Sequence, residues 1–105
     1  MAETFFQAVY AVVVKIPYGT VLSYGDIARM IGYPRRARFV GFAMRVCPEG
    51  LPWHRVVMAD GSIAGGDFAP VREMLLRKEG VPFLPDGRVD LNQCRAVIVS
   101  DRTES

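Results

Sequence analysis

Arginine is concentrated in the middle of the sequence, and this is the strongest chemical signal that the chain offers. Residues 29–55 hold six arginines against a single acid, Glu49, whereas the whole chain of 105 residues has a net charge of only +2. Because the planar guanidinium group matches phosphates and base edges, this distribution favours nucleic-acid binding. An ordinary solvated surface is the alternative interpretation. The arginines concerned are Arg29, Arg35, Arg36, Arg38, Arg45 and Arg55.

Nucleophilic and metal chemistry have few candidate residues. The chain has one histidine, His54, and two cysteines, Cys47 and Cys94, with no CxxC pair, so neither a multi-ligand zinc site nor a disulfide framework is expected. Cys47 falls on the core side of a predicted helix and Cys94 falls in the tail, where both are expected to be small buried apolar residues. We therefore expect no metal and no cofactor.

The composition predicts one small domain. The chain has 105 residues, of which 50% are hydrophobic, and this suffices for a single domain over residues 1–105 with a tail that frays at about residues 100–105. The uncharged run of residues 5–14 is shorter than the roughly 18 residues of a membrane span, and no signal-peptide pattern opens the chain. We expect a soluble, cytoplasmic protein that has no membrane contact.

Two short helices are predicted to position the arginines. Ser23 and Asp26 have the spacing of a capping box, and Gly32 stands where the helix that they open would end. A second helix, over about residues 35–46, has a core face and a basic face. Such a pair is typical of a helix-turn-helix. The core face holds Val40, Ala43, Met44 and Cys47, and the basic face holds Arg38, Gly41, Phe42 and Arg45.

The remaining segments predict an α+β fold that is mostly helical. A capping box that starts at Thr4 is expected to open a first helix. Asp60-Gly61 between apolar runs predicts a hairpin turn. Residues 68–79 have helical spacing, and Gly80 fits the end of that helix. We expect a winged-helix-like helix-turn-helix domain with a short hairpin.

Three motifs together resemble a known family. They are IPYGTVLSYGDIA at residues 16–28, ARFVGFAM at residues 37–44 and PWHRVV at residues 52–57. In this order they resemble the DNA-binding domain of O6-alkylguanine-DNA alkyltransferases, over about residues 6–90. The repair enzymes carry their alkyl-accepting cysteine in the third motif, where this chain has Trp53. That substitution is typical of the alkyltransferase-like proteins, and the chain is identified as a member of that group.

The resemblance implies binding of O6-alkylguanine in duplex DNA without alkyl transfer. The helix-turn-helix would enter the minor groove, Arg38 would fill the gap left by a flipped nucleotide, and Tyr24 would turn its phosphate. Trp53 would line the pocket for the flipped base. The DNA-binding residues would be Ser23, Tyr24, Arg35, Arg36, Arg38, Gly41 and Arg45. The lesion pocket would comprise Tyr24, Met44, Arg45, Trp53, Val56, Gly65 and Gly66.

The chemistry of the third motif agrees with this expectation. An alkyl acceptor must be a thiolate-like nucleophile, and an indole offers only an N–H donor. No catalytic residue is therefore expected, His54 is interpreted as a structural hydrogen-bonded residue, and Arg55 as a residue that supports the fold. Two departures from the family are visible. The segment 63–80 is slightly short and has Gly65-Gly66 where relatives carry larger residues, which predicts a more open pocket, and the tail lacks aromatic residues.

Partners and alternatives follow from the same resemblance. It implies that the bound complex flags the lesion for nucleotide excision repair, and the sequence has no dimerising segment, so a monomer is expected. One alternative is an active alkyltransferase that uses a cysteine outside the motif. The other is a sequence-specific helix-turn-helix regulator, which would prefer a sequence over a lesion. Trp53 as plain core, and Arg38 paired with Glu49 or Asp26, are the corresponding structural alternatives.

Overall fold

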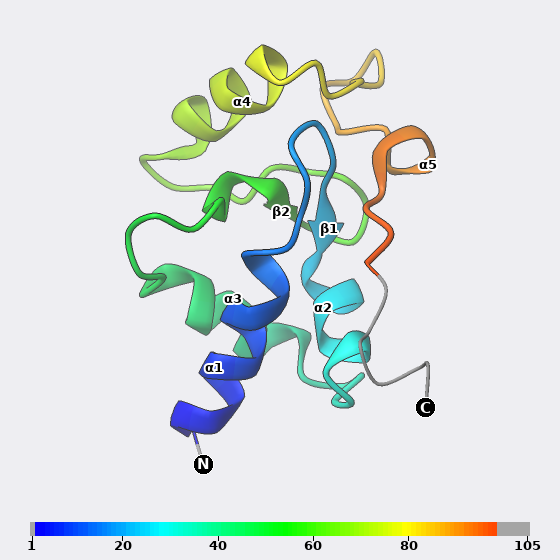
Figure 1. The fold of residues 1–105 in the computed structure, drawn as a ribbon. Helices are drawn as coiled ribbons and strands as arrows, with labels where there is room; N and C mark the ends of the chain where they lie inside the picture. Colours follow the sequence, from blue (N-terminus) through cyan, green and yellow to red (C-terminus); the bar gives the residue numbers. More distant parts are fainter. Residues whose placement is uncertain (1, 99–105) are drawn as a thin grey trace.

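The computed structural model describes residues 2–98, so the fraying expected for residues 100–105 lies outside the part described. It is an α+β fold that is mostly helical, as predicted, with two short strands (Figure 1). Its elements are α1 (Ala2–Val13), β1 (Leu22–Ser23), α2 (Tyr24–Met30), α3 (Ala37–Arg45), the 3-10 turn η1 (Trp53–Arg55), β2 (Val56–Val57), α4 (Ala69–Lys78) and α5 (Leu91–Cys94).

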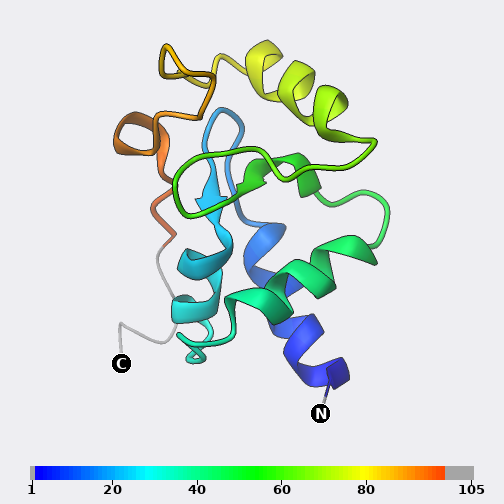
Figure 2. The same ribbon diagram turned by 180° about the vertical axis from the view of Figure 1, so that it is seen from behind.

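The two strands separate two hydrophobic cores. Helices α1, α2 and α3 gather at one end of the molecule and α4 and α5 at the other, with the strands between them (Figures 1 and 2). Leu22 and Val56 pack into the core of the first three helices, whereas Val21 and Val57 pack into the core beneath α4 and α5. Successive strand residues point to opposite faces of a sheet. β2 therefore contributes to both cores, and so does β1 together with Val21, the residue before it.

The predicted start and end of α2 are confirmed. The Ser23 hydroxyl accepts a hydrogen bond from the Asp26 amide at 3.0 Å, and the Asp26 carboxylate accepts one from the Ser23 amide at 2.9 Å, which completes the capping box. At the other end Gly32 adopts a φ of 88°, and the Tyr33 amide donates to the Ala28 carbonyl at 2.8 Å. This ending turns the chain sharply toward α3.

Helix boundaries differ from the predictions at two places. Helix α1 already includes Ala2, so Thr4 lies inside the helix and does not cap it. Helix α3 begins at Ala37, because Arg36 caps it after a turn in which the Arg36 amide donates to the Tyr33 carbonyl at 2.9 Å. The predicted helix over residues 68–79 forms as α4, one residue shorter at each end.

The predicted hairpin is wrong as a strand pair, although its turn forms. The Gly61 amide donates to the Met58 carbonyl at 2.9 Å, as a turn at Asp60-Gly61 requires. However, β2 pairs in parallel with β1, with Leu22 opposite Val56. Both residues of β2 are buried, and burial on both faces is typical of parallel strands rather than of hairpins. The crossover between the paired strands is the α2–α3 helix pair.

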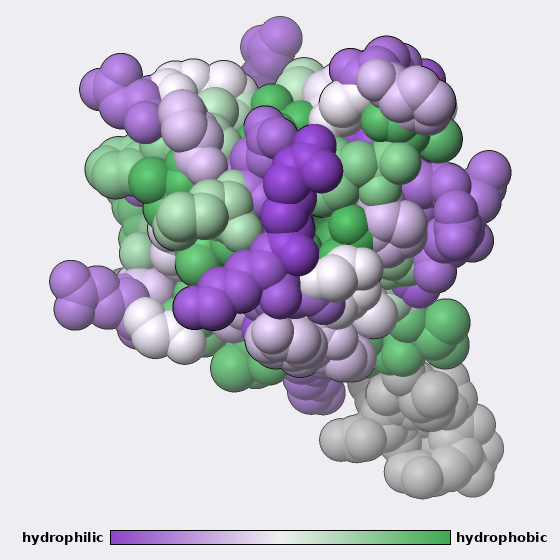
Figure 3. Space-filling model, turned by 90° about the horizontal axis from the view of Figure 1, so that it is seen from above, coloured by the Kyte–Doolittle hydropathy of each residue, from purple (hydrophilic) through white to green (hydrophobic). Residues whose placement is uncertain are grey.

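The outer side of α4 keeps several apolar residues at the surface. Phe68, Val71 and Met74 are exposed there. Figure 3 looks down on this end of the molecule and shows hydrophobic patches between hydrophilic side chains. Within residues 2–98 none of the helices is both long and apolar enough to cross a membrane.

Candidate nucleic-acid interface

Helix α3 has the two faces that its sequence predicts. Val40, Ala43 and Met44 are buried against the first core. Arg38, Phe42 and Arg45 are exposed on the opposite side. Between them, a Cβ added to Gly41 would meet nothing within 4 Å. The outer face of α3 is therefore open at its middle, and a bound molecule could approach the helix backbone there.

The arginines of this segment have no acidic partners. Among the described side chains, those of residues 4–98, no ion pair involves Arg35, Arg36, Arg38 or Arg45, and all four are exposed. The alternative pairing of Arg38 with Asp26 does not occur, because Arg29 and Arg95 hold the Asp26 carboxylate. The basic face thus keeps its guanidinium donors available for an anionic ligand such as a phosphate.

A cavity of about 540 Å³ opens between α3, the start of α2 and the loop before α4. Its volume is in the range of small-molecule sites, and it is large enough for one nucleobase. The structure brings most of the predicted site residues to it. Lining the cavity are Tyr24, Arg38, Gly41, Phe42, Met44, Arg45, Ala64, Gly65, Gly66 and Arg72.

Tyr24 brings a neutral hydrogen-bond donor to the cavity. Burial raises the pKa of its phenol above the usual value, against the opposing positive charges of Arg72 and Arg45. The hydroxyl therefore stays protonated at neutral pH. A protonated phenol next to two guanidinium groups can donate a hydrogen bond to a phosphate or to a base edge.

Arg72 is a site residue that the sequence analysis missed. Its Nη1 donates to the carbonyl oxygens of Ala64 and Gly65 at 3.3 and 3.4 Å, and its Cζ lies 5.2 Å from the centre of the Trp53 ring. It therefore ties the cavity loop to Trp53. No local pattern marks Arg72, since it is one basic residue among several on α4. Only the fold brings it to the cavity.

Trp53 and Val56 are not among the residues that line this cavity. Val56 is 2% exposed and packs in the first core. Trp53 is partly buried against the same core, 6.3 Å from the ring centre of Phe68. It also lines a second, shallower hollow of about 450 Å³ with Leu51, among other residues. The role predicted for Trp53 as a wall of the base pocket stays a prediction. Trp53 reaches the cavity only through Arg72, which lies over its ring and lines the cavity.

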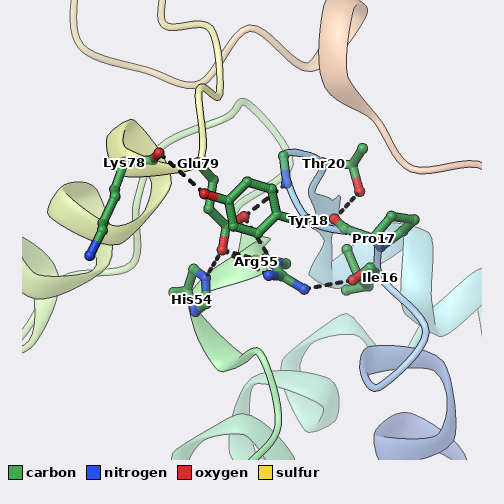
Figure 4. A network of polar contacts seen from close by, with 9 residues as sticks. Ile16, Pro17, Tyr18, Thr20, His54, Arg55, Lys78 and Glu79 are labelled. Atoms are coloured by element: carbon green, nitrogen blue, oxygen red, sulfur yellow. Dashed lines mark hydrogen bonds and ion pairs between the residues drawn. The ribbon is translucent and has the colours of Figure 1, made fainter.

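The next two residues of the motif are held by Glu79 (Figure 4). The His54 Nε2 lies 2.6 Å from one carboxylate oxygen of Glu79, and the Arg55 guanidinium donates to both oxygens at 2.8 to 3.1 Å. The Gly19 amide donates to the same carboxylate at 2.9 Å. Arg55 also donates to the Ile16 carbonyl at 2.9 Å. Both side chains are thus hydrogen-bonded within the fold, as expected from the sequence, and their interpretation as purely structural residues stays a prediction.

This network acts strongly on the acidity of Glu79. Burial by itself raises the pKa of the carboxyl group, but hydrogen bonds from Arg55, His54 and the Gly19 amide outweigh it and hold the pKa at about 2. The carboxylate is ionised at any physiological pH. It joins the end of α4 to the loop after α1 and to η1, three segments that are distant in the sequence.

The surroundings of both cysteines raise the pKa of the thiol. Cys94 is buried, and burial together with the charge of Asp90 raises the pKa of its thiol against the charge of Arg95. Burial also raises the pKa of the Cys47 thiol. Because the thiolate is the reactive form, these shifts disfavour the reactive form of both groups. Among the side chains that the structure describes, those of residues 4–98, no group of three or more metal-ligating side chains lies together.

The fold and the site define a helix-turn-helix domain with a basic recognition helix beside a base-sized cavity. Residues 4–81 match the family described as "6-O-methylguanine DNA methyltransferase, DNA binding domain". The chain belongs to this family.

Several members are similar over most of their length. The chain is 44% identical over 97 residues to the "DNA base-flipping protein" of Escherichia coli, covering 89% of this chain and 74% of that one. It is 43% identical over 84 residues to "Alkyltransferase-like protein 1" of Schizosaccharomyces pombe, covering 75% and 78%. The structure of S. pombe Atl1 in complex with damaged DNA containing O6-carboxymethylguanine superimposes with a TM-score of 0.80 at 34% identity, covering 91% and 97%.

Proposed function

We propose that this protein binds O6-alkylguanine in duplex DNA by flipping the damaged base, and that it does not transfer the alkyl group. The observation that carries the proposal is the base-sized cavity directly beside the unpaired arginines of α3. The relatives support it: one is named for base flipping, and another is solved with DNA that contains an O6-alkylated guanine.

The basic face supplies the docking surface in this proposal. Arg35, Arg36 and Arg45 contact phosphates while α3 lies in the minor groove, with Gly41 allowing close approach and the Ser23 end of α2 near the backbone. Arg38 enters the base stack and fills the gap, and Tyr24 donates to the phosphate of the flipped nucleotide. Flipping costs a few kcal/mol, and less for a poorly paired base. O6-Alkylguanine pairs badly, so selectivity begins at this step.

The cavity receives the flipped base in the second step. Met44 offers an apolar wall, and the Arg72 guanidinium offers a planar donor that is already oriented by two carbonyls and by Trp53. Gly65 and Gly66 add no side-chain bulk at the loop, which favours room for alkyl groups of different size. Trp53 supports this wall through Arg72, with Val56 packed in the core beside it.

Alkyl transfer has no suitable acceptor in this proposal. Trp53 stands where the repair enzymes have cysteine, and its indole offers no lone pair comparable to that of a thiolate. The thiols of Cys47 and Cys94 are held protonated by their surroundings. His54 makes its hydrogen bond to Glu79 and would have no nucleophile to activate.

The proposal extends to the cellular role. The chain would act as a single monomeric domain over residues 1–105 in the cytoplasm, and the bound complex would flag the lesion for nucleotide excision repair proteins. A stable complex that cannot remove the alkyl group leaves the lesion in place, so a second activity must complete the repair.

Two measurements, each with its own duplex, test the proposal. The protein is mixed with duplex DNA in which 2-aminopurine replaces the target base, and with a matched O6-methylguanine duplex. With the 2-aminopurine duplex we expect a rise of fluorescence on binding, since the base leaves the stack. With the O6-methylguanine duplex we expect the intact mass of the protein to stay unchanged after incubation. A mass gain equal to one methylene group would instead identify an alkyltransferase. Binding without any fluorescence change, together with preference for one sequence, would identify a regulator.

A further inference from the structure

A row of aromatic rings crosses the outer side of α3 and ends at the cavity. The ring centres of Phe5 and Phe39 lie 6.4 Å apart, and those of Phe39 and Phe42 lie 5.7 Å apart at an interplanar angle of 80°. Tyr33 continues the row on the far side of Phe5 at 5.6 Å. Edge-to-face contacts of this kind hold aromatic side chains in fixed orientations. The contact with Phe39 therefore restrains the orientation of the Phe42 ring.

Phe42 differs from the other rings because of what lies around it. It is 42% exposed, although it sits on a helix with a well-formed core face. It lines the cavity together with Arg38, and the Arg45 guanidinium lies 5.9 Å from the centre of its ring. Phe39 is equally exposed but does not line the cavity. A large apolar ring among guanidinium groups has no packing role toward the core.

We propose that Phe42 is a second DNA-inserting side chain, which wedges its ring into the base stack beside the gap that Arg38 fills. This inference rests on the proposed function and deepens it. Arg38 and Phe42 are four residues apart on one face of α3, a rise of about 6 Å. That distance is close to two base steps of about 3.4 Å each. The two side chains therefore address positions of the stack that lie about two steps apart.

The chemistry of minor-groove binding supports the assignment. Proteins that open the minor groove insert apolar wedges, and the unstacking is offset by the larger contact surface of the bent duplex. An aromatic ring stacks on any base, so such a wedge adds affinity without sequence preference. The Arg45 and Arg38 guanidinium groups flank the ring. When they bind phosphates or enter the stack, the ring lies next to the bases as well.

The test uses three duplexes that differ at one position: guanine, O6-methylguanine and an abasic site. The abasic duplex presents the gap without a base to flip, so it reports on insertion and not on the cavity. The variants are Phe42→Ala, Phe42→Leu and Phe42→Tyr, with Phe39→Leu as the matched control for an exposed ring of α3 outside the cavity. Thermal unfolding of each variant verifies the fold.

We expect Phe42→Ala to weaken binding to both the abasic and the O6-methylguanine duplex by about tenfold, the scale of one lost base–aromatic contact. Phe42→Leu keeps an apolar wedge without the ring and should fall between the alanine variant and the wild type. Phe42→Tyr keeps the ring and should bind like the wild type, as should Phe39→Leu. A loss confined to the O6-methylguanine duplex would place the ring against the flipped base and overturn the wedge, and so would wild-type affinity of Phe42→Ala for the abasic duplex. Equal wild-type affinity for guanine and O6-methylguanine would refute the proposed function instead, while the abasic duplex still decides the role of Phe42.

Discussion

Most arginines of this protein fall into two groups that the structure treats differently. Among the side chains of residues 4–98, five arginines outside the α3 segment are ion-paired and the four at α3 are not; Arg72 has no ion pair either, but bonds to the loop carbonyls. The same side chain therefore holds the fold in one region and is left for a ligand in the other. The paired group is Arg29, Arg55, Arg77, Arg88 and Arg95, and the unpaired group is Arg35, Arg36, Arg38 and Arg45.

The ion pairs of the paired group differ in how far their side chains are buried. The side chains of Arg55 and Glu79 are 16% and 7% exposed, whereas those of Arg77 and Glu73 are 53% and 46% exposed. Exposed pairs contribute little to stability because water and salt screen them. Breaking a buried pair leaves an uncompensated charge and is far more costly. The comparison thus predicts a graded series of effects, beginning with Arg55.

The largest effect is expected at Arg55. Arg55→Ala should lower the free energy of unfolding by about 3–5 kcal/mol, because Glu79 would stay buried without its main partner. Urea denaturation measures this change. The matched control is Arg77→Ala, which should cost no more than about 1 kcal/mol. Similar losses in the two variants would show that burial does not separate the two pairs.

The acid stability of the protein should depend on the same carboxylate. The pKa of Glu79 is lowered from 4.5 to about 2, so the unfolded chain takes up the proton first as the pH falls. The stabilisation is complete above pH 4.5 and is lost as the pH falls toward about 2. Asp26, whose pKa is also lowered, acts in the same direction.

Denaturation at a series of pH values measures this loss. Glu79→Gln has no proton to gain, so its stability should be lower at neutral pH and should fall less over the acid range. An equally steep acid loss in Glu79→Gln would assign the effect to other carboxylates.

Local signals were readable from the sequence, and long-range ones were not. The capping box of Ser23 and the turn at Gly32 act within a few residues, so their chemistry predicts α2 and the position of α3 directly. Arg72 and Glu79 act on residues that are far away in the sequence, and nothing near either one marks its partner.

The strand pairing was mispredicted for the same reason. The turn at Asp60-Gly61 is local and forms, but the partner of β2 is β1, which lies beyond α2 and α3 in the chain.

Trp53 shows the corresponding limit of the sequence for the binding site. The motif places it at the acceptor position, whereas its orientation relative to the cavity depends on the packing of α4.

In the unpaired group, Arg38 should have the largest effect on lesion recognition. Arg38→Ala should lower the preference for an O6-methylguanine duplex over the guanine duplex by about tenfold, or about 1.4 kcal/mol, because the gap in the stack would stay unfilled. Fluorescence anisotropy with both duplexes measures this. Arg77→Ala, from the paired group, serves as the control and should keep the preference. An intact preference in Arg38→Ala would refute its insertion.

The smallest effect is expected from Arg35 and Arg36, which should act through phosphates alone. Replacing both by alanine should weaken binding to damaged and undamaged DNA alike, and should reduce the slope of log K against log salt by about 2, since two fewer counterions are released. A salt titration measures the slope. Arg88→Ala, whose guanidinium already pairs with Asp86, should leave it unchanged. A change in lesion preference in the double variant would indicate base contacts instead.

The central claim is that the unpaired arginines and the cavity beside them form one lesion-binding site. Equilibrium binding to two duplexes that differ only by O6-methylguanine in place of guanine, at one fixed salt concentration, tests it most directly. The account predicts a preference for the damaged duplex of at least about tenfold. Equal dissociation constants for the two duplexes would contradict it, and would leave α3 as a general DNA-binding helix beside a cavity without function.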